Sequence, residues 1–306
     1  MKNTIIIILI LLAVVFGFYL LNQKESDIEE QVEEQSSLTV EETTDIEEMD
    51  EMEEQEVAWS RKSIIGTSVE GKNIIAYKYG TGEKELLFVG GIHGGYSWNT
   101  AVVAYDIIEY IEDNKNIIPD NIQVTIVPVL NPDGLSNVAE DYGPGLNESD
   151  ISGTESEKVA ARFNANDVDL NRNFACDWQE NAKWQNKDVS GGDEAFSEPE
   201  AKAIRDYVAI NNPTAAVVWY SAAGGVYSSS CHNGVLSETS ELNDLYSKAS
   251  GYPSYKEFDF YATTGDFVNW LAKESIPAIS VLLTTHDSPE TNKNINGLKA
   301  LLNYYK

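Results

Sequence analysis

The residue with the clearest chemical potential is His93, in the stretch GGIHGGYSWNT at residues 90–100. Glycines flank it, and it follows an apolar run. Histidine is the commonest metal ligand in proteins, and the chain has only two others, His232 and His286. A catalytic zinc ion normally takes three protein ligands and one water. If His93 holds a metal, the other ligands must come from distant parts of the chain.

The segments around these histidines alternate between strand-like and helix-like patterns. Short apolar runs predict buried strands, in the stretches 86–89, 121–130, 214–221 and 276–283. Helical spacing of apolar residues occurs between and after them, in the stretches 99–114, 197–210 and 290–306. In the second of these helices Ser197 and Glu200 have the spacing of a capping box, and Pro199 suits the first turn.

This alternation predicts an α/β domain with a mixed central sheet covered by helices on both faces. Loops at the carboxyl ends of such strands are the usual place for a functional site. Four polar residues stand at or just past predicted strand ends: His93, Asn131, Ser221 and His286. We therefore expect a site at that edge of the sheet.

Three motifs occur in a characteristic order, VLNPDG at 129–134, RFNANDVDLNRNF at 162–174 and SEPEAKAI at 197–204. In this order and spacing they resemble the zinc carboxypeptidases of the carboxypeptidase A-like metallopeptidase family. The resemblance covers about Ile64 to Lys306, and DLNRNF is its most specific part. It implies the fold of that family, zinc as cofactor, and peptides with a free C-terminus as ligands.

The resemblance also locates the metal chemistry, and there this chain departs from the family. The family has a His-x-x-Glu pair after a strand, a later His followed by Ser, and a catalytic Glu on a further strand. His93 matches the first ligand, but Tyr96 and Tyr220 occupy the other two ligand positions. Leu282 occupies the catalytic Glu position, or Leu283 if the register slips by one. Phenols ionise near pH 10 and leucine accepts no proton, so we expect little zinc and impaired hydrolysis.

The substrate-binding residues of the family are better matched. Asn171 and Arg172 match the pair that binds the terminal carboxylate of the substrate, and Arg162 matches the arginine that stabilises the oxyanion. Tyr261 resembles the mobile tyrosine that covers bound substrate. The alternative is structural, with each arginine paired to a carboxylate and the tyrosine capping the core.

Other readings of the histidines stay open. His93 can be a satisfied structural residue at a strand end, or it can join His232, His286 and an aspartate such as Asp287 in a rewired zinc site. A serine mechanism through Ser221 has weaker support, because no nucleophile-elbow pattern surrounds it.

The two cysteines, Cys176 and Cys231, each lie a few residues beyond a segment that lines the family's cleft. The resemblance therefore predicts that they form a disulfide, with two unrelated buried thiols as the alternative.

Composition narrows the possible partners. The formal net charge of the 306 residues is −29, which argues against nucleic acid, because phosphate binding depends on clustered Lys and Arg. Residues 1–23 carry Lys2 and an apolar run from Ile5 to Leu21, which predicts a single membrane-spanning helix. No small-residue cleavage site follows, so we expect an uncleaved signal anchor with the remaining chain outside the cytoplasm. Residues 24–57 are rich in acidic residues and predict a disordered tether, and residues 58–306 form the carboxypeptidase-like domain.

Three functions remain from the sequence. The first is recognition of the C-terminal carboxylate of peptides, including cell-wall stem peptides, with hydrolysis impaired or lost. The second is an active zinc carboxypeptidase or peptidoglycan peptidase with altered ligands. The third is an interaction scaffold that uses the fold without its chemistry.

Overall fold

The computed structural model describes residues 59–306. The membrane segment and the acidic tether predicted for residues 1–57 lie outside this range, so both stay predictions. Within residues 59–306, no helix has the length and apolar character that crossing a bilayer requires.

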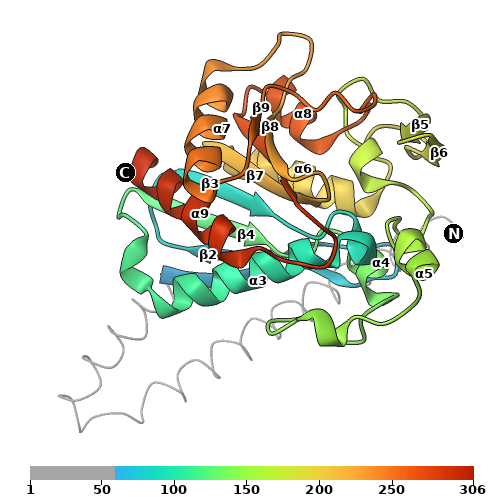
Figure 1. Cartoon of the computed structure of the whole chain (residues 1–306), viewed down its shortest axis with the longest axis horizontal. Coiled ribbons are helices and arrows are strands. Elements are labelled where there is room, and N and C mark those ends of the chain that lie inside the picture. The colour runs from blue at the N-terminus through green and yellow to red at the C-terminus, as the bar shows by residue number, and fades with distance from the viewer. Residues whose placement is uncertain (1–58) are drawn as a thin grey trace, which may run out of the picture. The chain divides into compact units, whose positions relative to one another are not determined.

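An eight-stranded mixed sheet forms the centre of the described domain, in the order β1-β2-β4-β3-β7-β10-β8-β9 (Figure 1). Its strands are β1 (Ser60–Thr67), β2 (Asn73–Tyr79), β3 (Lys84–Val89), β4 (Ile122–Val127), β7 (Ala215–Ser221), β8 (Gly225–Ser228), β9 (Ser254–Tyr255) and β10 (Ala278–Leu283). The central strands β4, β3, β7 and β10 are mutually parallel. Their carboxyl ends therefore meet at one edge of the sheet.

Helices cover both faces of the sheet. One face packs against α3 (Trp98–Asp113), α7 (Ser237–Ser250) and α9 (Thr291–Tyr305), and the other against α6 (Pro199–Asn211) and α8 (Phe267–Lys273). Short helices α4 (Pro132–Ser136) and α5 (Glu155–Ala160), and the hairpin of β5 (Asn181–Trp184) and β6 (Lys187–Ser190), lie in the loops. Single 3-10 turns occur at Gly94–Ser97, Lys115–Ile117, Glu148–Asp150 and Leu170–Arg172.

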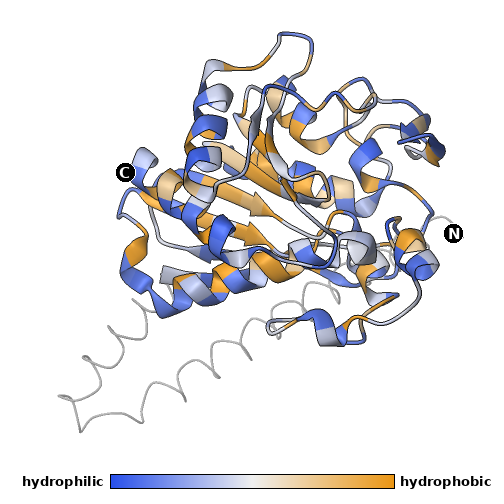
Figure 2. Ribbon diagram, in the orientation of Figure 1, coloured by the Kyte–Doolittle hydropathy of each residue, from blue (hydrophilic) through white to orange (hydrophobic). Residues whose placement is uncertain are grey.

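Alternation along the strands divides the core into two layers. In β7, Val217 and Trp219 pack toward the α3, α7 and α9 face, whereas Val218 and Tyr220 pack toward the α6 and α8 face. In the parallel register Leu282 pairs with Tyr220. Because side chains alternate along a strand, these two residues point to the same face. Apolar residues accordingly fill the strands in Figure 2, while hydrophilic residues gather on the outer sides of the helices.

The expected α/β architecture with a mixed, doubly covered sheet is confirmed, and each strand and helix predicted within residues 59–306 is present. The predicted capping box is wrong. Helix α6 has Glu198 as its N-cap residue without a side-chain capping bond. The Ser197 hydroxyl instead donates to the Glu198 carboxylate at 2.7 Å. Pro199 occupies the first turn as expected.

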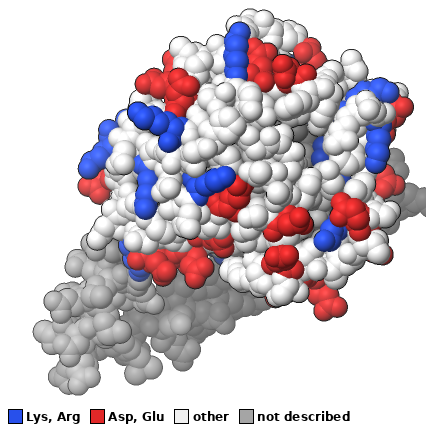
Figure 3. Space-filling model, in the orientation of Figure 1, with Lys and Arg blue, Asp and Glu red and all other residues white. Residues whose placement is uncertain are grey.

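Charged side chains of both signs are interspersed on the face of the molecule shown in Figure 3.

Candidate functional site

A cavity of about 820 Å³ opens at the carboxyl ends of β3, β7 and β10. It gathers all eight residues that the resemblance singled out, although they come from six separate segments of the chain. These are His93, Tyr96, Arg162, Asn171, Arg172, Tyr220, Tyr261 and Leu282. His232, His286 and Ser221 also border it. Asn131 does not: its buried side chain caps α4, where Oδ1 accepts from the Gly134 amide at 2.9 Å.

Arg172 provides a buried positive charge on the cavity wall. Its Nε donates to the Lys183 carbonyl at 2.9 Å, and Nη1 donates to the Asn171 carbonyl at 2.6 Å. The side chain is 1% exposed, and among the described residues no carboxylate lies within ion-pair distance of it. A guanidinium has five N–H donors, so these two bonds orient the group and leave three donors for other partners.

Asn171, beside Arg172, is tied into the wall. Its Nδ2 donates to Asp266 at 2.7 Å, and its Oδ1 accepts from the Phe267 amide at 3.0 Å. Asp266 also caps α8 through the Asn269 amide. Burial raises the pKa of the Asp266 carboxyl, and the positive charge of Arg172 acts in the opposite direction. These bonds fix the orientation of the Asn171 side chain. Because they use its Oδ1 and one N–H, the predicted contact with substrate has to come from the second N–H of the amide.

Arg162 also borders the cavity but has a different environment. Its Nε donates to Asp169 at 2.9 Å, so its charge is paired. Its guanidinium also stacks on the Trp184 ring, 4.4 Å from the centroid, and lies 5.7 Å from that of Tyr96. These contacts agree with the structural interpretation of Arg162, in which the arginine pairs with a carboxylate. It still borders the cavity.

Tyr261 stands at the mouth of the cavity in a half-buried position. The Arg172 guanidinium carbon lies 5.9 Å from the centre of its ring, and the Phe258 ring lies 5.0 Å away at a steep angle. It is therefore placed to cover a group bound at Arg172.

His93 is buried and has no hydrogen-bond partner for either ring nitrogen among the described residues. The nearest carboxylate oxygen, on Asp169, lies 3.8 Å from Nε2. Burial lowers the pKa of His93 well below its ordinary value, and the charges of Arg162 and Arg172 lower it further. The imidazole is therefore neutral at pH 7. It is not the satisfied structural histidine of the alternative reading.

The two phenols at the expected ligand positions are protonated. Burial raises the pKa of Tyr220 well above its ordinary value, and burial also raises that of Tyr96. The Tyr220 hydroxyl donates to Asn171 Oδ1 at 3.3 Å. The Tyr96 ring packs edge-on against Trp184 and lies 4.3 Å from the His286 ring. Because neither phenol is ionised, neither is a suitable ligand for a metal ion.

Of the two leucines that the resemblance offers for the catalytic Glu position, Leu282 is the one that faces the cavity. Leu282 borders the cavity and packs in the same layer as Tyr220, whereas Leu283 packs in the opposite layer beneath α3, α7 and α9. An apolar side chain therefore faces the cavity at this position.

Zinc does not fit the donors gathered around His93. Within residues 59–306, one group of three or more His, Cys, Asp and Glu side chains has donor atoms close enough to hold an ion, and His93 is outside it. His286 Nδ1 is hydrogen-bonded to the Tyr96 carbonyl at 3.0 Å, and His232 pairs with Asp177 at 2.6 Å. Asp287 does not border the cavity. The structure therefore does not bring His93, His232, His286 and Asp287 together as the ligands of one zinc ion.

Ser221 has no histidine partner in the described part of the chain. Its hydroxyl donates to Asn99 Oδ1 at 2.8 Å, which leaves no base to activate it as a nucleophile.

The predicted disulfide is confirmed. Cys176 and Cys231 are bonded, with their Cα atoms 6.2 Å apart. The bond links the loop after Arg172 to the loop after β8, and both cysteines border the cavity.

Sequence reasoning missed three residues of this site. Trp184 comes from the β5–β6 hairpin, and no motif marks it. Asp169 and Asp266 hold Arg162 and Asn171. Asp169 lies inside DLNRNF, so its motif position was the available signal. Asp266 precedes a short apolar helical segment, a position typical of an N-cap.

The comparisons with known proteins agree with this geometry. The sequence model described as zinc carboxypeptidase matches residues 46–293. Bacteriocin BCN5 of Clostridium perfringens is 26% identical over 241 residues, covering 77% of this chain and 24% of the relative. Carboxypeptidase Z of Gallus gallus is 32% identical over 123 residues, covering 36% of this chain and 18% of the relative. This chain thus spans about a quarter or less of these relatives.

The fold is also found in solved structures, among them the following two. Bovine thrombin-activatable fibrinolysis inhibitor, in complex with tick carboxypeptidase inhibitor, superposes with a TM-score of 0.63 at 17% identity, covering 85% of this chain and 94% of the other. Murein-tripeptide amidase MpaA from Escherichia coli O157 gives a TM-score of 0.53 at 21% identity, covering 79% and 91%.

Proposed function

The chain belongs to the zinc carboxypeptidase family, and we propose that it binds the C-terminal carboxylate of peptides while its hydrolytic activity is impaired or lost. The observation that carries this proposal is Arg172. Its guanidinium is buried on the wall of the cavity, is oriented by two backbone carbonyls, and has no carboxylate within ion-pair distance among the described residues. A buried charge without a counter-ion is costly. A ligand carboxylate would supply that counter-ion.

The arrangement around Arg172 suits a terminal carboxylate in particular. A planar guanidinium binds both oxygens of a carboxylate at once, and Tyr261 lies over the same guanidinium. Arg162 and Asp169 already neutralise each other, so Arg172 is the stronger attractor for a carboxylate in this cavity. The negative charge of the whole chain opposes this attraction weakly, because distant charges are screened by salt.

The loss of hydrolysis follows from three positions. Zinc lowers the pKa of its bound water to about 7, and a nearby carboxylate then takes the proton. Here protonated phenols stand at Tyr96 and Tyr220, and Leu282 stands at the carboxylate position. Loss of a general base alone typically costs about 10²- to 10⁴-fold in rate.

Cell-wall stem peptides are the class of ligand that we propose. They end in free carboxylates, and the support from the comparisons is a shared fold with a murein-tripeptide amidase. We also propose that residues 1–23 anchor the chain in a membrane and that the domain lies outside the cytoplasm. Protease treatment of intact cells should then remove the domain, whereas protection of the domain in intact cells would contradict this location.

One observation favours the alternative of a zinc peptidase. Neither ring nitrogen of His93 has a hydrogen-bond partner among the described residues, so one of them is available to a metal ion. Metal analysis distinguishes the two readings, because a zinc peptidase would retain about one zinc per chain after dialysis and would lose it in His93→Ala.

The test of carboxylate recognition compares a peptide with its amide. Random peptides with free C-termini would be screened against the immobilised chain, and the best ligand titrated as acid and as C-terminal amide. Loss of a charge-assisted hydrogen bond costs about 1.5–3 kcal/mol, or roughly ten- to a hundredfold in affinity. We expect this loss for the amide with the wild-type chain, and for the acid with Arg172→Gln.

Two controls accompany this titration. Arg205→Gln removes an exposed arginine of α6 that pairs with its neighbour Asp206, and it should bind the acid as the wild type does. Arg172→Lys keeps the charge without the planar fork, and it should bind with intermediate affinity. Equal affinity for acid and amide would contradict carboxylate recognition, and so would unchanged binding by a folded Arg172→Gln variant. Either result would favour the hypothesis that the domain is an interaction scaffold.

A further inference from the structure

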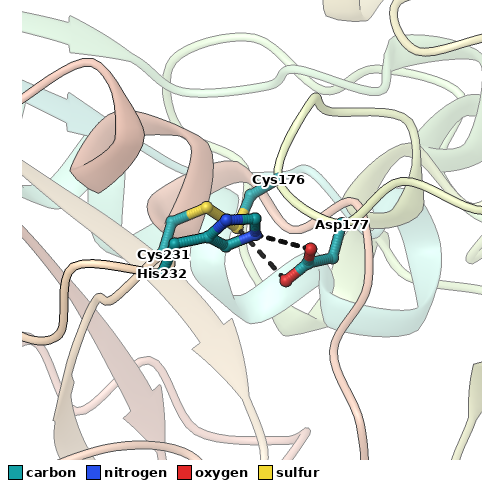
Figure 4. A group of neighbouring side chains, drawn as sticks. All are labelled: Cys176, Asp177, Cys231 and His232. Atoms are coloured by element: carbon teal, nitrogen blue, oxygen red, sulfur yellow. Dashed lines mark hydrogen bonds and ion pairs between the residues drawn. A yellow bond between two sulfur atoms is a disulfide. The ribbon is translucent and has the colours of Figure 1, made fainter.

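A second group of polar side chains borders the cavity beside its disulfide. It consists of Cys176, Asp177, Cys231 and His232, and one donor atom from each lies within 4.8 Å of the others. Figure 4 shows the imidazole of His232 and the carboxylate of Asp177 facing each other next to the two sulfurs. The group is made of two pairs of adjacent residues that lie 55 positions apart in the chain.

These four residues cannot bind a metal ion together while the disulfide is intact. The sulfurs are bonded to each other, and a disulfide sulfur is not a thiolate, which is the form that binds metal. His232 Nε2 lies 2.6 Å from Asp177 Oδ1. The other carboxylate oxygen lies 3.9 Å from Cys176 Sγ, which is a contact without a hydrogen bond because the bonded sulfur carries no hydrogen.

We infer that reduction of this disulfide creates a zinc site with two thiolates, one imidazole and one carboxylate. A dithiol supplies the two electrons and two protons that split the S–S bond, and it leaves as its own disulfide. Zinc then displaces the two thiol protons to solution and binds both sulfurs. Asp177 and the imidazole of His232 complete the four ligands that tetrahedral zinc requires.

The geometry needs little change of the backbone. Zn–S bonds of about 2.3 Å in a tetrahedron place two sulfurs roughly 3.8 Å apart. Cα atoms 6.2 Å apart allow that separation by rotation of the two side chains.

The other two ligands are free to reorient. The side chains of Asp177 and His232 are 59% and 67% exposed, and exposed ion pairs are weak, so an ion can displace the bond between them. Both residues also hold left-handed backbone conformations, with φ of 51° and 54°. Residues other than glycine seldom adopt these conformations. Both side chains lie beside the two sulfurs (Figure 4).

This site is separate from the metal position of the family. His93 is not in the group, and none of the four residues stands at a family ligand position. The inference is therefore independent of the proposed carboxylate recognition. An ion here would add a divalent cation to the wall of the same cavity.

The test measures metal binding by the full chain in two redox states. The protein is reduced with a dithiol, freed of it by gel filtration without oxygen, and titrated with Zn²⁺ and with Co²⁺. We expect one equivalent of tightly bound metal in the reduced chain and none in the oxidised chain. The cobalt form should show thiolate charge-transfer absorption and tetrahedral bands. Absence of binding after reduction, or equal binding in both states, would overturn the inference.

Two variants keep the disulfide and so the fold of the oxidised chain. His232→Ala and Asp177→Asn should each weaken zinc binding by the reduced chain at least about tenfold, because loss of even an outer partner of a metal site costs that much. His93→Gln is the matched control and should leave it unchanged. Loss of zinc in His93→Gln with no effect of His232→Ala would place the ion at the family position and refute the inference.

Discussion

The disulfide should contribute a large share of the stability of the domain. Cys176 and Cys231 close a loop across 55 positions of sequence. The loss of loop-closure entropy in the unfolded chain grows slowly with loop length, and for a loop of this size it amounts to about 4 kcal/mol at 25 °C. We therefore expect Cys176→Ser/Cys231→Ser to lower the free energy of unfolding by about that amount. For a domain of this size, the melting temperature should fall by roughly 8–16 °C.

The assay is urea denaturation followed by tryptophan fluorescence and by circular dichroism. Three samples are compared: the oxidised wild type, the wild type reduced with a dithiol in the absence of metal, and the double serine variant. The reduced wild type lacks the disulfide but keeps both cysteines. Comparing it with the serine variant therefore separates the entropy of loop closure from the cost of burying two serine hydroxyls. Both sulfurs are nearly buried, and we expect the serine variant to be the least stable of the three.

Two results would refute this reasoning. If thiol titration of the native chain finds two free cysteines, the bond does not form. If the reduced wild type unfolds within about 1 kcal/mol of the oxidised protein, the loop is already ordered in the unfolded ensemble and the entropy argument fails.

Two further predictions concern the donors of the cavity. The pKa of His93 is depressed in the folded state, so protonation of this histidine favours the unfolded chain once the pH falls below about 6.5. The free energy of unfolding should then decrease by up to about 1.4 kcal/mol per pH unit until the pH reaches the folded pKa. Urea midpoints at pH 7.5 to 4.5 should therefore fall less steeply for His93→Gln, and parallel profiles would contradict the assignment. Tyr96→Glu/Tyr220→His supplies the two ligands that the family pattern lacks, so the oxidised variant should retain about one zinc per chain after dialysis. If it retains none, ligand identity alone does not explain the absence of a zinc site around His93.

The fold could be predicted from local patterns because its central strands are apolar on both faces. Apart from Lys84 at the start of β3, every residue of β3, β7 and β10 is buried, and the order of the motifs then identified the architecture. The capping of α6 could not be predicted in the same way. Ser197 has the right type and spacing, but its hydroxyl is taken by the neighbouring Glu198, and such competition depends on the folded loop.

The membership of the site could also be predicted, whereas its electrostatics could not. The motif positions correctly predicted that His93, Arg172 and Leu282 line one cavity. The sequence gives no sign that Arg162 is neutralised by Asp169 while Arg172 is held by backbone carbonyls. This difference arises from tertiary contacts, and it is what makes Arg172 the better receptor for a carboxylate.

The central claim is that the cavity recognises a peptide carboxylate without zinc. The most direct measurement is a calorimetric titration of the oxidised chain with a free-acid peptide ligand, before and after exhaustive treatment with a metal chelator. The account predicts the same affinity in both titrations, with the peptide recovered intact. A loss of binding after chelation that added zinc restores, or release of the C-terminal residue during the titration, would contradict it.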